Sequence, residues 1–244
     1  MPIEFGSYSV EVAEEEARQS SGSAFIKLQN GVNRLRILPP EKGEKSPFKT
    51  VLQHVIEKPG DTRPIRFGCP GQGCPACEMA SRLHASGNPK DEKQARSFER
   101  KLRTFAIVIN RKEEERGPLI WEFGKTVAVK LQKIRVDEDA GGEFTHPYKG
   151  FDVKVEKTGE GLGTRYEVMA ARESSPLAPD EETLQSWWNS KPDLNNFTRI
   201  SSLDDVLKLL GSPDDEDEAP VRGRLPAGRV VGTKRRTAED DLES

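Results

Sequence analysis

The sequence predicts a β-rich α+β fold, with a small antiparallel barrel or sandwich and helices toward the C-terminal end. Two observations lead to this class. Six short segments are rich in β-branched and aromatic residues, and several of them alternate apolar and polar side chains. Beyond residue 176, leucine and tryptophan recur at the spacing of amphipathic helices.

The expected strands lie at 34–37, 48–56, 104–110, 119–123, 151–157 and 164–169. The last two are joined by a glycine-rich segment and predict a hairpin. In the first strand, Leu35 and Ile37 alternate with Arg34 and Arg36, so the basic side chains are expected to face outward. Helices are expected at 92–103, 125–134, 180–189 and 201–210.

All three cysteines, Cys69, Cys74 and Cys77, lie within nine residues. This C-x4-C-x2-C run, with His54 upstream, supplies the three thiolates and one imidazole of a closed tetrahedral zinc site. The odd number of cysteines argues against a disulfide framework. His54 is favoured as the fourth ligand over His84, which follows the cysteines on an expected helical stretch. One structural Zn²⁺ is therefore expected, with no position open for a substrate.

The composition excludes several classes of protein. No run of 18 apolar residues is present to cross a membrane, and the first residues lack the pattern of a secretory signal, so a soluble cytoplasmic protein is expected. The sequence contains no H-E-x-x-H motif, nucleophile elbow or G-x-x-x-x-G-K-[ST] loop. The chain is accordingly expected to bind a partner and not to act as an enzyme.

Charge is distributed unevenly along the chain. Residues 1–22 carry five acids and one base, residues 23–175 carry 28 bases and 21 acids, and residues 176–244 carry nine bases and fifteen acids. A basic centre with acidic ends is typical of a protein that attracts a polyanion. We expect an acidic flexible arm (1–22), a core (23–175) with a zinc subdomain at about 54–103, a helical segment packed on the core (176–212) and a disordered tail (213–244).

Basic and aromatic residues interleave within the core, as binding of a single-stranded nucleic acid requires. Cations hold the phosphates, and exposed aromatic faces stack on the bases. Phe105 and Tyr148 are the best candidates for stacking, whereas Trp121 and Phe123 alternate with Glu122 and are expected to face the core. The other candidate contacts are Arg100, Lys101, Arg103, Arg111, Lys112, Lys125, Arg165 and Tyr166.

Several motifs follow one another between residues 25 and 169. They are VNRLRILP at 32–39, the zinc-ligand candidates with CPAC at 74–77, RKLRT at 100–104, EFGK at 122–125, PYKGF at 147–151 and GLGTRY at 161–166. In this order they resemble the T-even-type bacteriophage single-stranded DNA-binding proteins, the gene 32 protein family. The His-Cys-Cys-Cys order is the most specific part of the resemblance.

The resemblance implies an oligonucleotide-binding (OB) barrel with an inserted zinc subdomain and a basic, aromatic cleft between them. It implies coating of single-stranded DNA without sequence preference during phage DNA replication, recombination and repair. By position, the zinc ligands would be His54, Cys69, Cys74 and Cys77, the cleft aromatics Phe105, Tyr148 and Tyr166, and the phosphate contacts Arg100, Lys101, Arg103, Arg111 and Lys112. The acidic tail would compete with DNA and recruit replication and recombination proteins.

One feature departs from the family. The basic N-terminal arm that links neighbouring molecules on the strand is replaced by the acidic run from Glu11 to Glu16, and a similar basic motif stands at 234–237 instead. Association of the protein with itself along the strand is therefore a hypothesis. Two alternatives from other classes remain open: a zinc-stapled adaptor that binds proteins through the helices at 180–211, and a nucleic-acid enzyme without a recognisable motif.

Overall fold

The computed structural model describes residues 24–57, 64–137 and 142–211, and the expected arm and tail lie outside these ranges. Its strands are β1 (Gly31–Ile37), β2 (Lys49–Ile56), β3 (Ile65–Gly68), β4 (Lys101–Asn110), β5 (Leu119–Gly124), β6 (Phe151–Thr158) and β7 (Arg165–Ser174). Its helices are α2 (Pro75–Ala85), α3 (Pro89–Phe98), α4 (Lys125–Val136), α5 (Glu181–Ser190), α6 (Asn195–Thr198) and α7 (Leu203–Leu210), with short 3-10 turns at Glu114–Arg116 and Gly161–Gly163.

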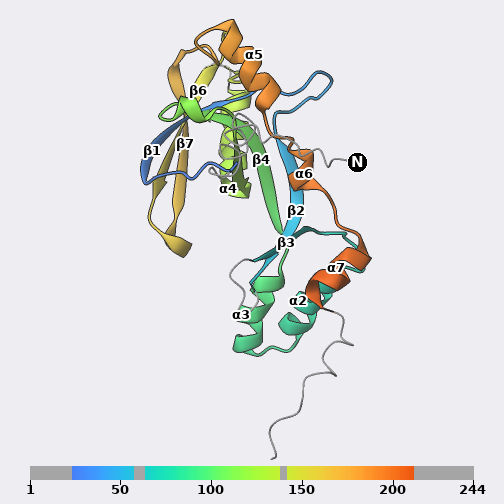
Figure 1. Cartoon of the computed structure of the whole chain (residues 1–244). Helices are drawn as coiled ribbons and strands as arrows, with labels where there is room; N and C mark the ends of the chain where they lie inside the picture. The colour runs from blue at the N-terminus through green and yellow to red at the C-terminus, as the bar shows by residue number, and fades with distance from the viewer. Residues whose placement is uncertain (1–23, 58–63, 138–141, 212–244) are drawn as a thin grey trace, which may run out of the picture. The chain divides into compact units, whose positions relative to one another are not determined.

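The seven strands form one antiparallel sheet in the order β3-β2-β4-β1-β6-β7, with β5 paired to β4 (Figure 1). The long strand β4 pairs with β2 through its first half and with β1 through its second half, so it joins the two parts of the sheet. The predicted α+β class and the β6–β7 hairpin are confirmed. The sequence did not predict β3, and α3 ends at Phe98 because Glu99 is already extended.

The main core is enclosed by β1, β4, β5, β6, β7 and α4. Leu35, Val108, Phe123 and Val153 from four of these strands meet Leu131 of α4 in one buried cluster. Helix α4 packs against β4, β5 and β7. Among the described residues β5 and β7 do not pair with each other, and α4 covers the core on that side. This arrangement agrees with the OB-like barrel that the resemblance implies.

Arg36 corrects the expected orientation of β1. Its side chain is fully buried, and the guanidinium donates hydrogen bonds to the carbonyl oxygens of Phe144, His146 and Phe151. Burial lowers the pKa of Arg36 to about 10, although the nearby Asp152 carboxylate acts in the opposite direction. Arg36 thus fixes the loop before β6 instead of facing solvent, because three carbonyl groups replace its water.

The segment after β7 packs on the sheet in two places. Leu177 and Trp187 of the first contact join Leu38 and Ile109, and Leu194 of the second joins a cluster around β2 and β4. No helix among the described residues is long and apolar enough to span a membrane. The expected domain boundary near residue 175 stays a prediction.

Candidate metal centre and nucleic-acid interface

The metal centre is assembled from two paired strands and the start of a helix. His54 lies on β2 opposite Phe67 of β3, and β3 leads directly into Cys69. Cys74 is the N-cap residue of α2, and Cys77 follows in its first turn. The ligand atoms of these four residues all lie within 4.8 Å of one another.

Three of the distances between these atoms match those around one tetrahedral ion. With Zn–S bonds of about 2.3 Å and Zn–N bonds of about 2.0 Å, tetrahedral geometry places two sulfurs about 3.8 Å apart and a sulfur and a nitrogen about 3.5 Å apart. The Sγ atoms of Cys69 and Cys77 are 3.6 Å apart, and those of Cys74 and Cys77 are each 3.5 Å from His54 Nε2. The group can therefore hold one metal ion.

Neighbouring groups orient the ligands and shift their pKa values. His54 Nδ1 donates to the carbonyl oxygen of Phe98 at 2.7 Å, which directs Nε2 toward the sulfurs. Burial lowers the pKa of His54, which favours the neutral imidazole that a metal ion requires. Burial and the adjacent sulfur of Cys69 raise the pKa of Cys77 to about 12. A negative charge on one sulfur thus disfavours a negative charge on its neighbours. A bound cation would relieve this repulsion between thiolates.

Cys69 differs from the other sulfurs because it receives donors from outside the cluster. The Gly71 N–H lies 3.4 Å from its Sγ atom, and Nη1 of Arg100 lies 3.7 Å from it. Although burial acts in the opposite direction, these donors hold the pKa of Cys69 below its usual value. The alternative ligand His84 stands outside the cluster, since its Nε2 pairs with Glu99 at 2.9 Å.

A groove runs beside the metal centre. It consists of two hollows of about 610 and 930 Å³ that meet at Ile26 and Glu122, residues that line both. Phe67 links the groove to the centre, because it lines the larger hollow and stacks on the His54 ring at 4.9 Å between centroids. Together the two hollows are lined by residues of β2, β3, β4, β5, β6 and β7, by the described residues before β1 and by residues after α5.

The groove is strongly basic. Among the described residues, its lining contains five cations and one carboxylate: Lys27, Arg66, Arg103, Lys157 and Arg199, with Glu122. Glu122 lies between two of them, 3.0 Å from Arg66 and 3.4 Å from Arg103. Three aromatic rings that are only partly buried, Phe25, Tyr166 and Phe197, also line the groove.

Two buried polar atoms in the groove have no hydrogen-bond partner among the described residues, Arg103 Nε and Gln53 Oε1. Arg103 Nε lies near Glu122 but without hydrogen-bond geometry. A buried polar group without a partner costs free energy, and both atoms have too little exposed surface to contact a ligand in this structure.

The model of the family described as gp32 DNA binding protein like matches residues 29–211. This chain belongs to that family. The match covers the sheet, the metal centre and the helices that follow. This gp32-like protein therefore matches its family over most of its length. A comparison with curated protein sequences gives no match.

Some predicted DNA contacts of this gp32-like protein do meet in the groove. Arg103 and Tyr166 line it, and Lys125 is exposed directly after the lining residue Gly124. Arg100 and Lys101 are exposed at the start of β4, and Arg165 is exposed on the side of β7 opposite Tyr166. Trp121 and Phe123 are buried in the core as predicted.

Two predicted contacts make close contacts within the protein, and their contact with DNA stays a prediction. Phe105 lines the larger hollow, but its side chain is only 2% exposed, because it packs with Leu194 and lies beside Phe197. Arg111 donates to Asp152, Glu114 and the carbonyl oxygens of Pro176 and Leu177. Its guanidinium is thus committed to holding the C-terminal segment on the sheet.

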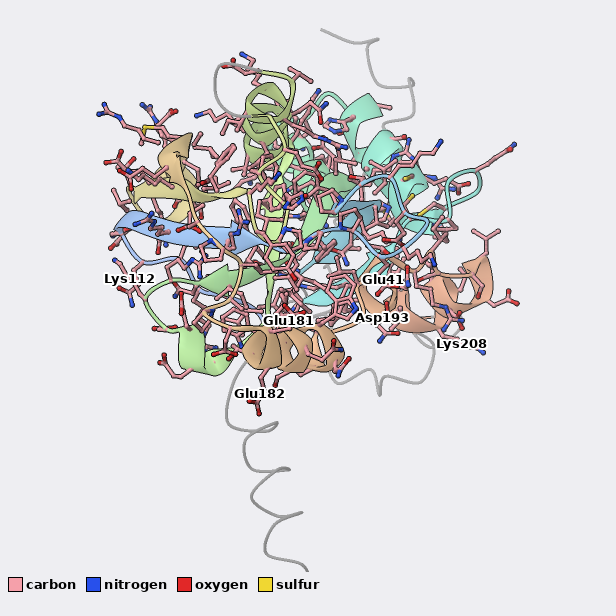
Figure 2. All side chains as sticks on the ribbon, turned by 90° about the horizontal axis from the view of Figure 1, so that it is seen from above. Glu41, Lys112, Glu181, Glu182, Asp193 and Lys208 are labelled. Carbon is pink, nitrogen blue, oxygen red and sulfur yellow. The ribbon has the colours of Figure 1, made fainter. Side chains whose placement is uncertain are left out.

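Two further predicted contacts are exposed but stand apart from the groove lining of the described residues. Lys112 projects from the turn after β4 (Figure 2). Tyr148 is 59% exposed, and its hydroxyl donates to Glu181 Oε2 at 2.9 Å. That carboxylate raises the pKa of Tyr148.

The groove also contains residues that the sequence did not indicate: Phe25, Lys27, Arg66, Lys157, Phe197 and Arg199. Arg66 stands between the apolar residues Ile65 and Phe67, an alternation that could have marked β3 as a strand with one basic face. For Phe197 and Arg199 no local signal exists, because only the path of the chain after α5 brings them to the groove.

Proposed function

We propose that this protein binds single-stranded DNA in the groove without preference for sequence, and coats strands exposed during replication, recombination and repair. The composition of the groove supports the proposal: five cations face one carboxylate, beside the partly exposed rings of Phe25, Tyr166 and Phe197. Cations bind phosphates of any nucleotide, and aromatic rings stack on any base. This composition supports a binding role.

Different residues of the groove would contact the phosphates and the bases of the strand. Lys27 and Lys157 would contact phosphates along the strand, while Tyr166 would stack on a base. Arg103, whose side chain is partly exposed in the groove, would bind a further phosphate. Because phosphates and the faces of bases are common to all nucleotides, these contacts add affinity with little selection among sequences.

We propose Zn²⁺ as the metal held by His54, Cys69, Cys74 and Cys77. Three thiolates and an imidazole in a tetrahedral arrangement are the ligand set that zinc prefers in structural sites. When bound, the ion would supply a fixed node that joins β2, β3 and α2. Phe67 would carry that rigidity into the groove, since it stacks on His54 and lines the larger hollow.

The experiment that tests this function is a fluorescence-anisotropy titration of a labelled oligo-dT strand at several salt concentrations. For a single strand the logarithm of the affinity falls with the logarithm of salt by about 0.7 per phosphate contact, so three to five contacts give a slope of about −2 to −3.5. A duplex of equal length should bind more weakly. Absence of binding would support the adaptor alternative, and metal-dependent breakdown of the strand would support an enzyme.

We further propose that the acidic tail at 213–244 competes with DNA for the groove and recruits replication and recombination proteins in a bacterial cytoplasm. Its excess of acids over bases supports this role. The same titration with a chain ending at residue 212 should then give tighter binding and a weaker dependence on competing polyanions. An unchanged affinity would contradict competition by the tail.

A further inference from the structure

Residues 194–201, which we call the strap, cross β3 directly beside the metal centre. The Ser201 N–H donates to the carbonyl oxygen of Gly68 at 3.1 Å, and Ile200 forms a parallel bridge with Gly68. A Cβ atom at Gly68 would lie 2.2 Å from the carbonyl oxygen of Arg199. Position 68 thus requires glycine because the strap backbone occupies the space of a side chain.

The side chains of the strap turn toward the groove. The Phe197 ring meets the Phe25 ring edge to face, with 5.2 Å between centroids, and both line the larger hollow. Arg199 is exposed and lines the same hollow, and Asp205 of α7 interacts with it electrostatically. Across the hollow lie Arg66 and Gln53 of the sheet.

We propose that the strap is a wall of the DNA site, in which Phe197 stacks on a base and Arg199 binds a phosphate. This inference rests on the proposed function and extends it to a segment outside the sheet. A cation and an aromatic ring on the strap face a second cation across a hollow of about 930 Å³, so an oligonucleotide strand between them would meet charge on both sides.

The strap is better described as a wall than as a lid that must leave. Leu194 at its start is buried with Val51, Phe105 and Ile120, and α6 contacts β2 (Figure 1). Displacing the strap would expose this apolar cluster to water, which is unfavourable. The buried start of the strap therefore holds the fold together, while the partly exposed Phe197 and the exposed Arg199 line the larger hollow.

A matched pair of variants tests the role of Arg199. Arg199→Gln should weaken oligo-dT binding about fivefold and make the salt slope shallower by about 0.7, because one phosphate contact is lost. Lys208→Gln removes the same charge from α7, a helix that supplies no lining residue in the described chain, and should leave both quantities unchanged. Equal effects of the two substitutions would overturn the proposal, since they would show only the influence of net charge.

Two further variants test the strap as a unit. Phe197→Leu keeps an apolar contact with Phe105 but removes the stacking face, so affinity should fall at least about fivefold while thermal stability changes little. Gly68→Ala should displace the strap and lower the affinity further. A rise in affinity would identify the strap as a blocking element and refute the wall. Metal content shows whether Gly68→Ala has damaged the centre, in which case the Arg199 pair decides.

Failure of the strap and failure of the proposed function give different results. If the unmodified protein does not bind oligo-dT, the proposed function is wrong. If it binds with a steep salt slope, but Arg199→Gln and Phe197→Leu bind equally well, only the strap proposal is wrong.

Discussion

The metal centre and the groove share β2 and β3 but are built in opposite ways. In the centre, four side chains bring their ligand atoms within 4.8 Å, and three of these residues are buried. The groove draws its lining from six strands, the strap and the residues before β1, and its five cations are all wholly or partly exposed. The centre suits one ion in one geometry, whereas the groove suits a flexible polymer that adapts to it. Substitution of one ligand in the centre should therefore abolish metal binding. Substitution of one residue in the groove should lower DNA affinity only in part.

The largest effect is expected at the centre. Cys77→Ser removes one thiolate, so the remaining three ligands should lose the metal, and the strands and helix that it joins should separate. We expect a loss of at least about 4 kcal/mol in the free energy of unfolding. The melting temperature should fall by about 10 °C or more, together with oligo-dT affinity.

Metal content and thermal melting check this expectation. His84→Gln is the matched control, because His84 lies on the same helix but outside the ligand cluster, and this variant should keep one metal per chain. A Cys77→Ser protein that retains its metal and its melting temperature would show that the centre is not a staple.

A smaller and graded effect is expected in the groove. Arg103→Gln removes a lining cation, so oligo-dT affinity should fall about tenfold at low salt, with the salt slope shallower by about 0.7 and the metal retained. Lys112→Gln removes the same charge from the turn after β4 and should leave binding unchanged. If Lys112→Gln loses more oligo-dT affinity than Arg103→Gln, the DNA binds near the other end of β4 instead of in the groove.

The centre could be predicted from the sequence because its chemistry admits few residue types and three of its ligands are close neighbours. The choice of His54 depended on more than spacing. Pairing of β2 with β3 places His54 opposite Phe67, two residues before Cys69, and β3 is only four residues long. A strand this short gives little periodic signal, so the ligand could be favoured from the sequence but its partner strand could not.

The groove was predicted less well because charge alone does not reveal the surroundings of a basic side chain. Arg103 and Arg111 stand near the two ends of β4, yet one lines the groove and the other holds carbonyl groups of the C-terminal segment. Arg36, like Arg111, donates to main-chain carbonyl oxygens. Only the fold shows which arginine has main-chain carbonyls within reach. Lys27 and Arg199 meet at the groove from opposite ends of the described chain, which no local pattern could indicate.

The smallest expected effect is a gain in DNA affinity. It shows whether Glu122 competes with DNA for two arginines of the groove or orients them for DNA. Glu122 is the one carboxylate in the lining of the described residues and contacts both Arg66 and Arg103. Glu122→Gln keeps the shape of the side chain but frees both guanidinium groups for phosphates, so affinity should rise about two- to fivefold with a steeper salt slope. Loss of these partly exposed ion pairs should cost at most about 1 kcal/mol of stability.

The control for this gain is Glu167→Gln, which changes the net charge equally at an exposed residue of β7 that pairs with Lys130 outside the groove lining. Its affinity should stay the same. If Glu122→Gln instead binds DNA more weakly, Glu122 orients Arg66 and Arg103 more than it competes for them. The groove would then resemble the metal centre, with a preset geometry in place of adaptable charges.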